Sequence, residues 1–286
     1  MKNYILLSAI CISVASCFTS CDKVKDARDP NVQVISGNRK VLIEDYTGHK
    51  CGNCPAAADT LRYLHNVYGE KIVPIAIHAG SFANINANYP TDFRTATGNA
   101  YDTEFGISSA GNPNGLINRV GHGTGGFIKA YSSWEAETVQ MLSTAAKFEL
   151  KINNSFTASS NLLNTKVTVK SLTTNSGIYK LVVLLTEDSI VAEQLDYRIV
   201  SPPAPSQKIT NYVFNHVLRD AINSTWGDAV FTSGAFLNDS TTKVYTKTIS
   251  TSYRPEKCHV VAYIYDADPN SPTYYEVLQA EEKHVK

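Results

Sequence analysis

The segment of residues 40–78 constrains the fold most, because it predicts a strand, a helix and a second strand in that order. Residues 40–46 (KVLIEDY) and 71–78 (KIVPIAIH) are short apolar runs, and apolar side chains recur between them at steps of three and four. Strands joined by a helical crossover pair in parallel. Pro74 has no N–H to donate to a ladder, so we expect the second strand to lie at a sheet edge.

The predicted helix begins beside two cysteines in the stretch TGHKCGNCP. Pro55 suits a first helical turn, where its missing N–H would be unpaired anyway, and Gly69 is a typical helix stop. The helical spacing places one set of residues on the buried face: Cys54, Ala57, Leu61, Leu64 and Tyr68. We therefore expect Cys51 to be exposed at the helix N-terminus and Cys54 to be buried.

The spacing of Cys51 and Cys54 suits thiol chemistry. A helix N-terminus favours the reactive thiolate, and Lys50 adds a positive charge, so Cys51 is the predicted attacking thiol and Cys54 the resolving one. Two alternatives remain. A static disulfide would close a very short loop and add little stability, and a zinc site with His49 and His78 would lack a second Cys-x-x-Cys. We expect no metal and no cofactor.

The pattern of polar and apolar residues changes from Lys147 onward. Short runs of alternating polarity are separated by Asn, Ser, Thr and Gly: FELKI, TKVTVKSL, YKLVVLLTED, KVYTKTIS and HVVAYIYD. These runs predict an all-β, immunoglobulin-like sandwich domain over residues 147–286, with a helical patch at residues 211–222. Cys258 shares strand parity with apolar neighbours and is predicted to be a small core residue.

The N-terminus predicts export. Lys2 precedes an apolar run that ends in small residues, which is typical of a signal peptide and too short for a spanning helix. Cys21 follows a sequence similar to the lipobox of bacterial lipoproteins, and Cys17 is the alternative acylation site. We expect residues 1–20 to be the signal peptide, and lipid on Cys21 to hold the chain on a membrane through the polar tether of residues 21–38.

The net charge and one glycine-rich segment indicate whether the chain binds nucleic acid or a nucleotide. Lys plus Arg and Asp plus Glu both number 26, which gives no electrostatic basis for binding nucleic acid. Residues 121–126 (GHGTGG) have the glycine spacing of a dinucleotide-binding loop, but they do not form the first turn of their own strand-helix-strand unit. We interpret them as a turn and expect no nucleotide.

The first half of the chain resembles the thioredoxin superfamily. Cys-Gly-Asn-Cys stands between a strand and a helix, Asp45 precedes Cys51 by six residues, and residues 106–119 (GISSAGNPNGLINR) are similar to the segment with a cis-proline, here Pro113. The resemblance implies a thioredoxin-like domain over residues 39–146, closed by a helix at about 128–146.

The resemblance also implies roles for residues around the cysteines. Pro113 would lie beside them. Strand alternation turns either Glu44 or Asp45 inward, and the six-residue offset favours Asp45 as the base that accepts the proton of Cys54.

The chain as a whole resembles the outer membrane protein 28 family, thioredoxin-like lipoproteins of Bacteroidetes. The match is carried by Thr-Gly before Cys-Gly-Asn-Cys-Pro, by Ile-Ala-Ile-His, by Asn-Arg after Pro-Asn-Gly, and by His-Val-Leu-Arg-Asp. It implies an outer membrane lipoprotein, facing the periplasm or the exterior, that exchanges electrons with protein thiols or disulfides in the cell envelope. The alternative is a surface binding or adhesion module that uses the same fold as a scaffold.

The chain also departs from ordinary thioredoxins. Lys50 replaces a tryptophan, Asn53 replaces a proline, and residues 79–100 form an insertion, so the substrate class stays open. His216, Arg219 and Trp226 lie in the segment that resembles the family, and we assign them no chemistry.

Overall fold

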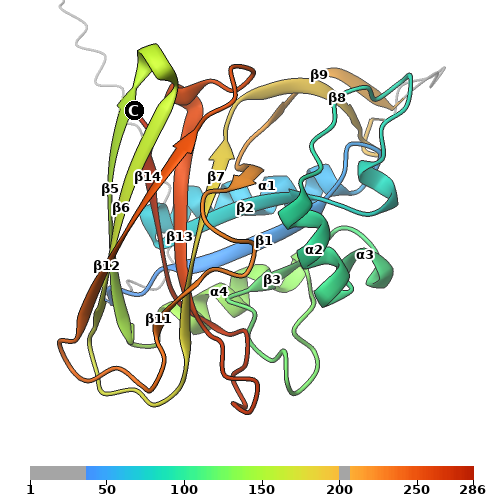
Figure 1. The fold of residues 1–286 in the computed structure, drawn as a ribbon. Coiled ribbons are helices and arrows are strands. Elements are labelled where there is room, and N and C mark those ends of the chain that lie inside the picture. Colours follow the sequence, from blue (N-terminus) through green and yellow to red (C-terminus); the bar gives the residue numbers. More distant parts are fainter. Residues whose placement is uncertain (1–36, 200–206) are drawn as a thin grey trace, which may run out of the picture. The chain divides into compact units, whose positions relative to one another are not determined.

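The predicted strand, helix and strand are present as β1 (Val41–Thr47), α1 (Cys54–Tyr68) and β2 (Ile72–His78), and β1 and β2 pair in parallel (Figure 1). Proline stands in the first turn of α1, and Gly69 ends the helix with φ 58°, a conformation that favours glycine. The buried face of α1 holds Cys54, Ala57, Leu61 and Leu64, as the helical spacing predicts, whereas Tyr68 is only partly buried.

The computed structural model describes residues 37–199 and 207–286, all within one compact unit, Gln33–Lys286. The predicted signal peptide, both candidate acylation sites, Cys17 and Cys21, and nearly all of the tether lie outside the described residues. Among the described helices, none is both long enough and apolar enough to cross a membrane.

A nine-stranded mixed sheet runs through the described unit in the order β14-β13-β7-β10-β2-β1-β3-β4, with β11 paired to β7. Its strands are β3 (Asn114–Ile117), β4 (Lys129–Ala130), β7 (Tyr179–Glu187), β10 (Val217–Ala221), β11 (Asp228–Phe231), β13 (Cys258–Asp266) and β14 (Val277–His284), together with β1 and β2. The predicted domain boundary after residue 146 falls between α4 (Trp134–Leu142) and β5 (Phe148–Thr157), and the sheet takes strands from both sides of it.

The expectation that β2 is an edge strand is wrong, because β10 pairs beside it. The N–H of Ala76 donates to the carbonyl of His216 at 2.8 Å, and Val217 is the β10 residue in register with Ala76. Strand alternation points the nitrogen of Pro74 to the same side as that of Ala76. The pairing with β10 does not extend to Pro74, so its missing N–H interrupts no hydrogen bond there.

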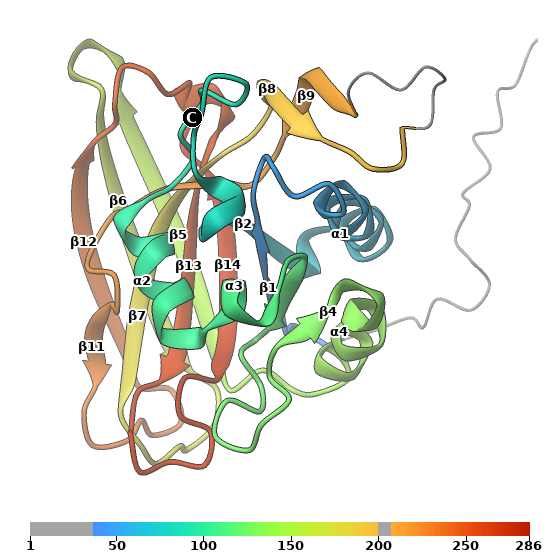
Figure 2. The ribbon, with the colours of Figure 1, turned by 90° about the vertical axis from the view of Figure 1, so that its right-hand side faces the viewer.

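Helices cover both faces of the β1 region (Figure 2). Odd residues of β1 pack with α1 and α4 in a cluster that includes Ile43, Leu64 and Trp134. Even residues pack on the other side with α2 (Ala96–Phe105), α3 (Ile107–Ala110) and side chains of β13. The predicted closing helix at about 128–146 is present in part, since α4 is the shorter helix Trp134–Leu142.

A three-stranded sheet, β12-β6-β5, faces the β7, β13 and β14 part of the large sheet (Figure 1). It is formed by β5, β6 (Leu162–Ser171) and β12 (Ser240–Thr248). Alternating apolar residues of β5, β6, β7 and β13 make a shared core with side chains of β12 and β14. Cys258 belongs to this core with Val260, Ala262 and Ile264, which confirms its predicted place.

The helical patch predicted at residues 211–222 is wrong. That segment contains most of β9 (Lys208–Phe214) and all of β10. β9 pairs antiparallel with β8 (Ile190–Leu195) in a separate two-stranded sheet, and β10 joins β7 and β2. Pairing with β8, β7 and β2 decides the strand conformation here and overrides the local helical spacing.

A buried ion pair connects the first half of the chain with the second. Both side chains of Glu44 and Arg119 are fully buried, and the guanidinium donates to the carboxylate at 2.6 and 2.7 Å. Arg119 also donates to the hydroxyl of Tyr263 in β13 at 2.8 Å and lies over the ring of Tyr101. Because both charges are paired and hydrogen-bonded, the free-energy cost of burying them is offset.

Candidate active site

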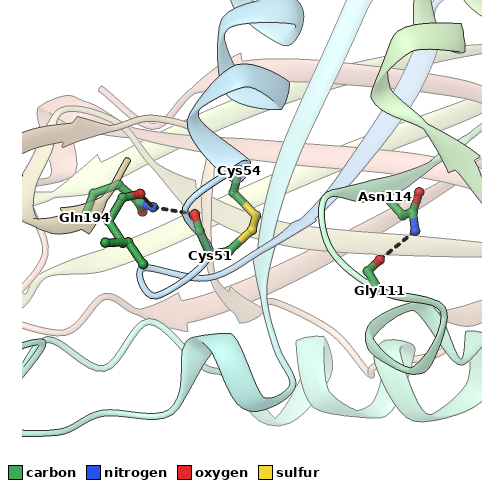
Figure 3. The surroundings of a disulfide bond; sticks show 6 residues. Cys51, Cys54, Gly111, Asn114 and Gln194 are labelled. Atoms are coloured by element: carbon green, nitrogen blue, oxygen red, sulfur yellow. Dashed lines mark hydrogen bonds between the residues drawn. A yellow bond between two sulfur atoms is a disulfide. The ribbon is translucent and has the colours of Figure 1, made fainter. Parts of the chain in front are cut away.

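Cys51 and Cys54 form a disulfide, with an S–S distance of 2.03 Å and Cα atoms 5.3 Å apart (Figure 3). Cys54 is the first residue of α1, and Cys51 precedes it in the loop after β1. The sequence prediction of a Cys-x-x-Cys pair at this helix N-terminus is confirmed. Unpaired N–H groups at such a terminus favour a thiolate when the pair is reduced.

Cys51 is buried, and the prediction of an exposed attacking thiol is wrong. Both cysteines are only 2% exposed. The cover comes from residues 194–198, which comprise the end of β8 and the turn after it and which we call the covering segment. A helix N-terminus is open to solvent in isolation, but here a strand distant in the sequence lies against the loop.

The covering segment binds the cysteine loop mainly through backbone atoms. Leu195 N donates to His49 O at 2.8 Å, and Tyr197 N donates to Gly52 O at 2.9 Å. The side-chain amide of Gln194 donates to Cys51 O at 3.0 Å (Figure 3). A Cβ at Gly52 would lie 2.5 Å from the ring of Tyr197, so this close approach requires glycine.

The predicted insertion after β2 covers the same loop from another side. Lys50 N donates to Phe82 O at 3.1 Å, and a Cβ at Gly48 would lie 2.5 Å from the backbone of Phe82. Nε2 of His49 lies 3.2 Å from the carbonyl oxygen of Asn84. The insertion therefore helps to position the residues that precede Cys51.

Asp45 lies on the same side of β1 as α1. The expectation that only one of Glu44 and Asp45 faces inward is wrong, because both faces of β1 are covered and both side chains are buried. Asp45 is 2% exposed, and its Oδ1 has no hydrogen-bond partner among the described residues. Burial raises the pKa of Asp45 to about 7. A carboxyl group with this pKa can both accept and release a proton near neutral pH.

A cavity of about 80 Å³ connects Asp45 with Cys54. It is lined on one side by β1, β2 and α1 and on the other by β9 and the residues after it: Tyr212, Val213, Phe214, Asn215 and His216. Its volume is sufficient for a few water molecules. The cavity therefore offers a path by which a proton can reach or leave Asp45.

His78 lines the same cavity and is buried at 2% exposure. Neither ring nitrogen has a hydrogen-bond partner among the described residues. Burial, with smaller contributions from His49 and Arg219, lowers the pKa of His78 to about 3, so the ring is neutral at physiological pH. Across residues 37–199 and 207–286, no three His, Cys, Asp or Glu side chains come together to hold a metal ion.

Pro113 follows a cis peptide bond with Asn112, as the resemblance implies. Figure 3 shows Gly111 and Asn114, which flank this proline loop, among the surroundings of the disulfide. The side-chain amide of Asn114 donates to Gly111 O at 2.6 Å and closes the loop. The structure thus brings Asp45, Cys51, Cys54 and the loop of Pro113 to one region.

Sequence reasoning missed Gln194, Tyr197 and the β9 side of the cavity. Alternation in residues 190–195 (IVAEQL) could have predicted a strand. The sequence holds no signal for where that strand lies, since Gln194 and Cys51 are 143 residues apart.

The fold and the site define a class of mixed α/β protein with a Cys-x-x-Cys disulfide at a helix N-terminus. The family model described as outer membrane protein Omp28 matches residues 98–286, which are 189 of the 286 residues. The chain belongs to the Omp28 family, and its location is the outer membrane. The matched region begins after the two cysteines, so membership alone assigns them no role.

Two solved structures share the fold at low sequence identity. HBP35 of Porphyromonas gingivalis has a TM-score of 0.58 and 13% identity, over 87% of this chain and 76% of that one. A protein of Agrobacterium tumefaciens has a TM-score of 0.53 and 11% identity, over 87% and 95% of the two chains. A search of curated proteins finds no match.

A domain of the outer membrane lipoprotein Omp28 from Porphyromonas gingivalis is also similar. It is 18% identical over 50% of this chain and 91% of that domain, with a TM-score of 0.31.

Proposed function

We propose that the protein is a membrane-anchored thiol-disulfide exchange protein of the cell envelope, with Cys51 and Cys54 as its redox pair. The observation that carries the proposal is the placement of the disulfide: it lies at the N-terminus of α1, and Cys54 shares a cavity with the buried carboxyl group of Asp45, whose Oδ1 has no hydrogen-bond partner among the described residues. A purely structural disulfide across so short a loop would need neither a helix N-terminus nor a buried carboxyl group beside it.

The exchange balances as a two-electron transfer. In the reduced pair, the Cys51 thiolate attacks one sulfur of a protein disulfide, and the other sulfur leaves as a thiolate. Cys54 then gives its proton to Asp45, and its thiolate attacks the Cys51 sulfur of the mixed disulfide. The second substrate thiolate leaves, the Cys51–Cys54 bond forms, and two electrons have passed to the substrate. The reverse sequence oxidises a protein dithiol.

The raised pKa of Asp45 supports its role as the base in this step. An ordinary aspartate is too weak a base for a thiol, whereas a buried carboxylate that favours its protonated form accepts a proton readily. The loop of Pro113 and the N-terminus of α1 form the surroundings of the sulfur atoms. Within this proposal, residues 39–146 are a thioredoxin-like domain and residues 147–286 an immunoglobulin-like sandwich that share one sheet.

The proposed anchor is lipid on Cys21, with Cys17 as the alternative. It would hold the exchange site near the membrane, where exported proteins acquire or lose disulfides. Mass spectrometry of the mature N-terminus of Cys21→Ser and Cys17→Ser variants tests the assignment. Loss of acylation only in Cys21→Ser supports Cys21, and loss only in Cys17→Ser supports Cys17.

A second candidate function is partner binding with the redox site as an inherited scaffold. Phe236, Leu237 and Val244 are 68%, 57% and 66% exposed and lie in and before β12. Exposed apolar side chains of this kind occur at binding surfaces. Loss of a bound partner in a Phe236→Ser variant, with no effect of Cys51→Ser on the same complex, would favour this function.

The test of exchange is mechanism-based trapping with Cys54→Ser. Without the resolving thiol, Cys51 should stay in mixed disulfides with envelope proteins, visible on non-reducing gels and lost on reduction. The Cys51→Ser/Cys54→Ser variant is the matched control and should trap nothing. Absence of trapped species, together with a Cys51–Cys54 bond that mild reductants do not open, would contradict the proposal.

A further inference from the structure

The covering segment donates backbone hydrogen bonds to the cysteine loop, as a bound polypeptide can. Leu195 and Tyr197 are alternate residues, and their N–H groups donate to His49 O and Gly52 O on either side of Cys51. Between them, Asp196 N points the other way and donates to Gln207 O. Leu195 is the last residue of β8, and Tyr197 and Arg198 form a turn, so the chain contacts the cysteine loop where it leaves its pairing with β9.

The covering segment contacts three consecutive parts of the cysteine loop. Besides the carbonyls of His49 and Gly52, Gln194 donates to the carbonyl of Cys51, which also accepts from Cys54 N, and the ring of Tyr197 lies close to Gly52. With these contacts in place, both cysteines are only 2% exposed. A protein substrate would need to lie over the same loop in order to bring a sulfur atom to Cys51.

A salt bridge fastens the end of the covering segment to α1. Nη1 of Arg198 lies 2.7 Å from Oδ2 of Asp59, and the same guanidinium makes a bidentate contact with Asp196. The Arg198 and Asp59 side chains are 48% and 40% exposed, so water competes for this contact. Tyr197 is half-exposed and leaves an apolar face open to solvent. A polypeptide that binds the cysteine loop can therefore displace the contacts of Arg198 and Tyr197.

We propose that residues 194–198 are an intramolecular occupant of the polypeptide site beside Cys51, and that exchange requires their release. The inference rests on the proposed redox function. The substrate that competes best is an extended polypeptide with a cysteine, because its backbone N–H groups replace those of Leu195 and Tyr197 on the same carbonyls. A small thiol gains no such contacts.

The test compares rates of reduction of the Cys51–Cys54 disulfide in the full-length protein. Two probes are used: dithiothreitol and a reduced, unfolded cysteine-containing polypeptide. Arg198→Ala/Tyr197→Ser should raise the rate about three- to tenfold with dithiothreitol, because a half-exposed salt bridge and one ring contact are lost. The increase should be larger with the polypeptide, which also binds the freed carbonyls.

The matched control is Arg62→Ala. Arg62 also pairs with Asp59, at 2.9 Å, so the variant loses the same charge from the same acceptor but leaves the covering segment fastened. Its reduction rates should equal those of the unchanged protein. Gly52→Ala is a second opening variant, because its Cβ displaces the ring of Tyr197 without touching Arg198.

Amide hydrogen exchange measures the release without any thiol chemistry. Exchange at Leu195 and Tyr197 should be faster in Arg198→Ala/Tyr197→Ser and unchanged in Arg62→Ala. Equal reduction rates and equal exchange in all variants would overturn the inference and leave the proposed function standing. A disulfide that neither probe reduces in any variant would overturn the proposed function and this inference with it.

Discussion

Glu44 and Asp45 are consecutive buried residues of β1, yet the first is paired with Arg119 while Oδ1 of the second has no partner among the described residues. Alternation along the strand points them to opposite faces. On one face the carboxylate is neutralised by a guanidinium, and on the other burial raises the pKa of Asp45 to about 7. One strand thus carries a structural ion pair and a proton-accepting group.

Asp45→Asn should slow exchange and stabilise the fold. The folded pKa of Asp45 is raised, so the folded state binds its proton more tightly, and stability falls as pH rises from about 4 to about 7. The variant should therefore unfold with a free energy roughly 2 to 4 kcal/mol higher at pH 8, a difference that shrinks toward pH 4. Urea unfolding at both pH values measures it.

The rate of the same variant tests the catalytic role of Asp45. Loss of the base should lower the rate of mixed-disulfide resolution by about tenfold or more at pH 7. Thr47→Val, which alters another residue lining the cavity, is the control and should keep the rate. An Asp45→Asn rate equal to that of the unchanged protein would contradict the assignment.

Arg119→Met should destabilise the fold by about 3 to 5 kcal/mol, because it leaves Glu44 buried without its cation. The double variant Glu44→Gln/Arg119→Met should recover part of this loss, since no charge is then buried. Chemical denaturation of the two single variants and the double variant gives the coupling energy. Additive effects of the two substitutions would show that the pair does not act as a unit.

Glu282→Gln should weaken the protein below neutral pH. Burial lowers the pKa of His259, but the adjacent Glu282 and then Asp188 outweigh burial and leave this pKa raised. A raised folded pKa gives stability that is present below about pH 6.5 and is lost as pH rises through the folded pKa. The variant should lose about 1 kcal/mol at pH 6 and less at pH 9. Thermal unfolding at the two pH values measures this loss. The nearby residues His284 and His216 are not substituted.

Cys258→Ala should leave thiol exchange unchanged. The thiol is fully buried in the core between the two sheets, and burial raises its pKa to about 12. The substitution should cost about 1 to 2 kcal/mol of stability through lost packing. Alkylation of the reduced, folded protein should leave Cys258 unmodified, and rapid labelling of Cys258 would contradict this placement.

The sequence by itself determined the local elements around the site. Periodicity fixed α1 and its buried face, Pro55 and Gly69 marked its ends, and strand alternation separated Asp45 from Glu44. The five alternating runs after residue 147 all form strands. These features depend on neighbours a few residues apart, where backbone geometry relates spacing directly to position.

Only the tertiary structure decided the exposure of Cys51, the interior place of β2 and the strand conformation of residues 208–214. Each depends on a pairing partner that local spacing does not identify: the covering segment for Cys51, His216 for Ala76 near Pro74, and β8 for β9. A backbone N–H donates to whichever carbonyl the fold brings near, whatever residue carries it. The residue types therefore predict that a strand forms but not which segment it pairs with. That pairing determines whether Cys51 is accessible to a substrate.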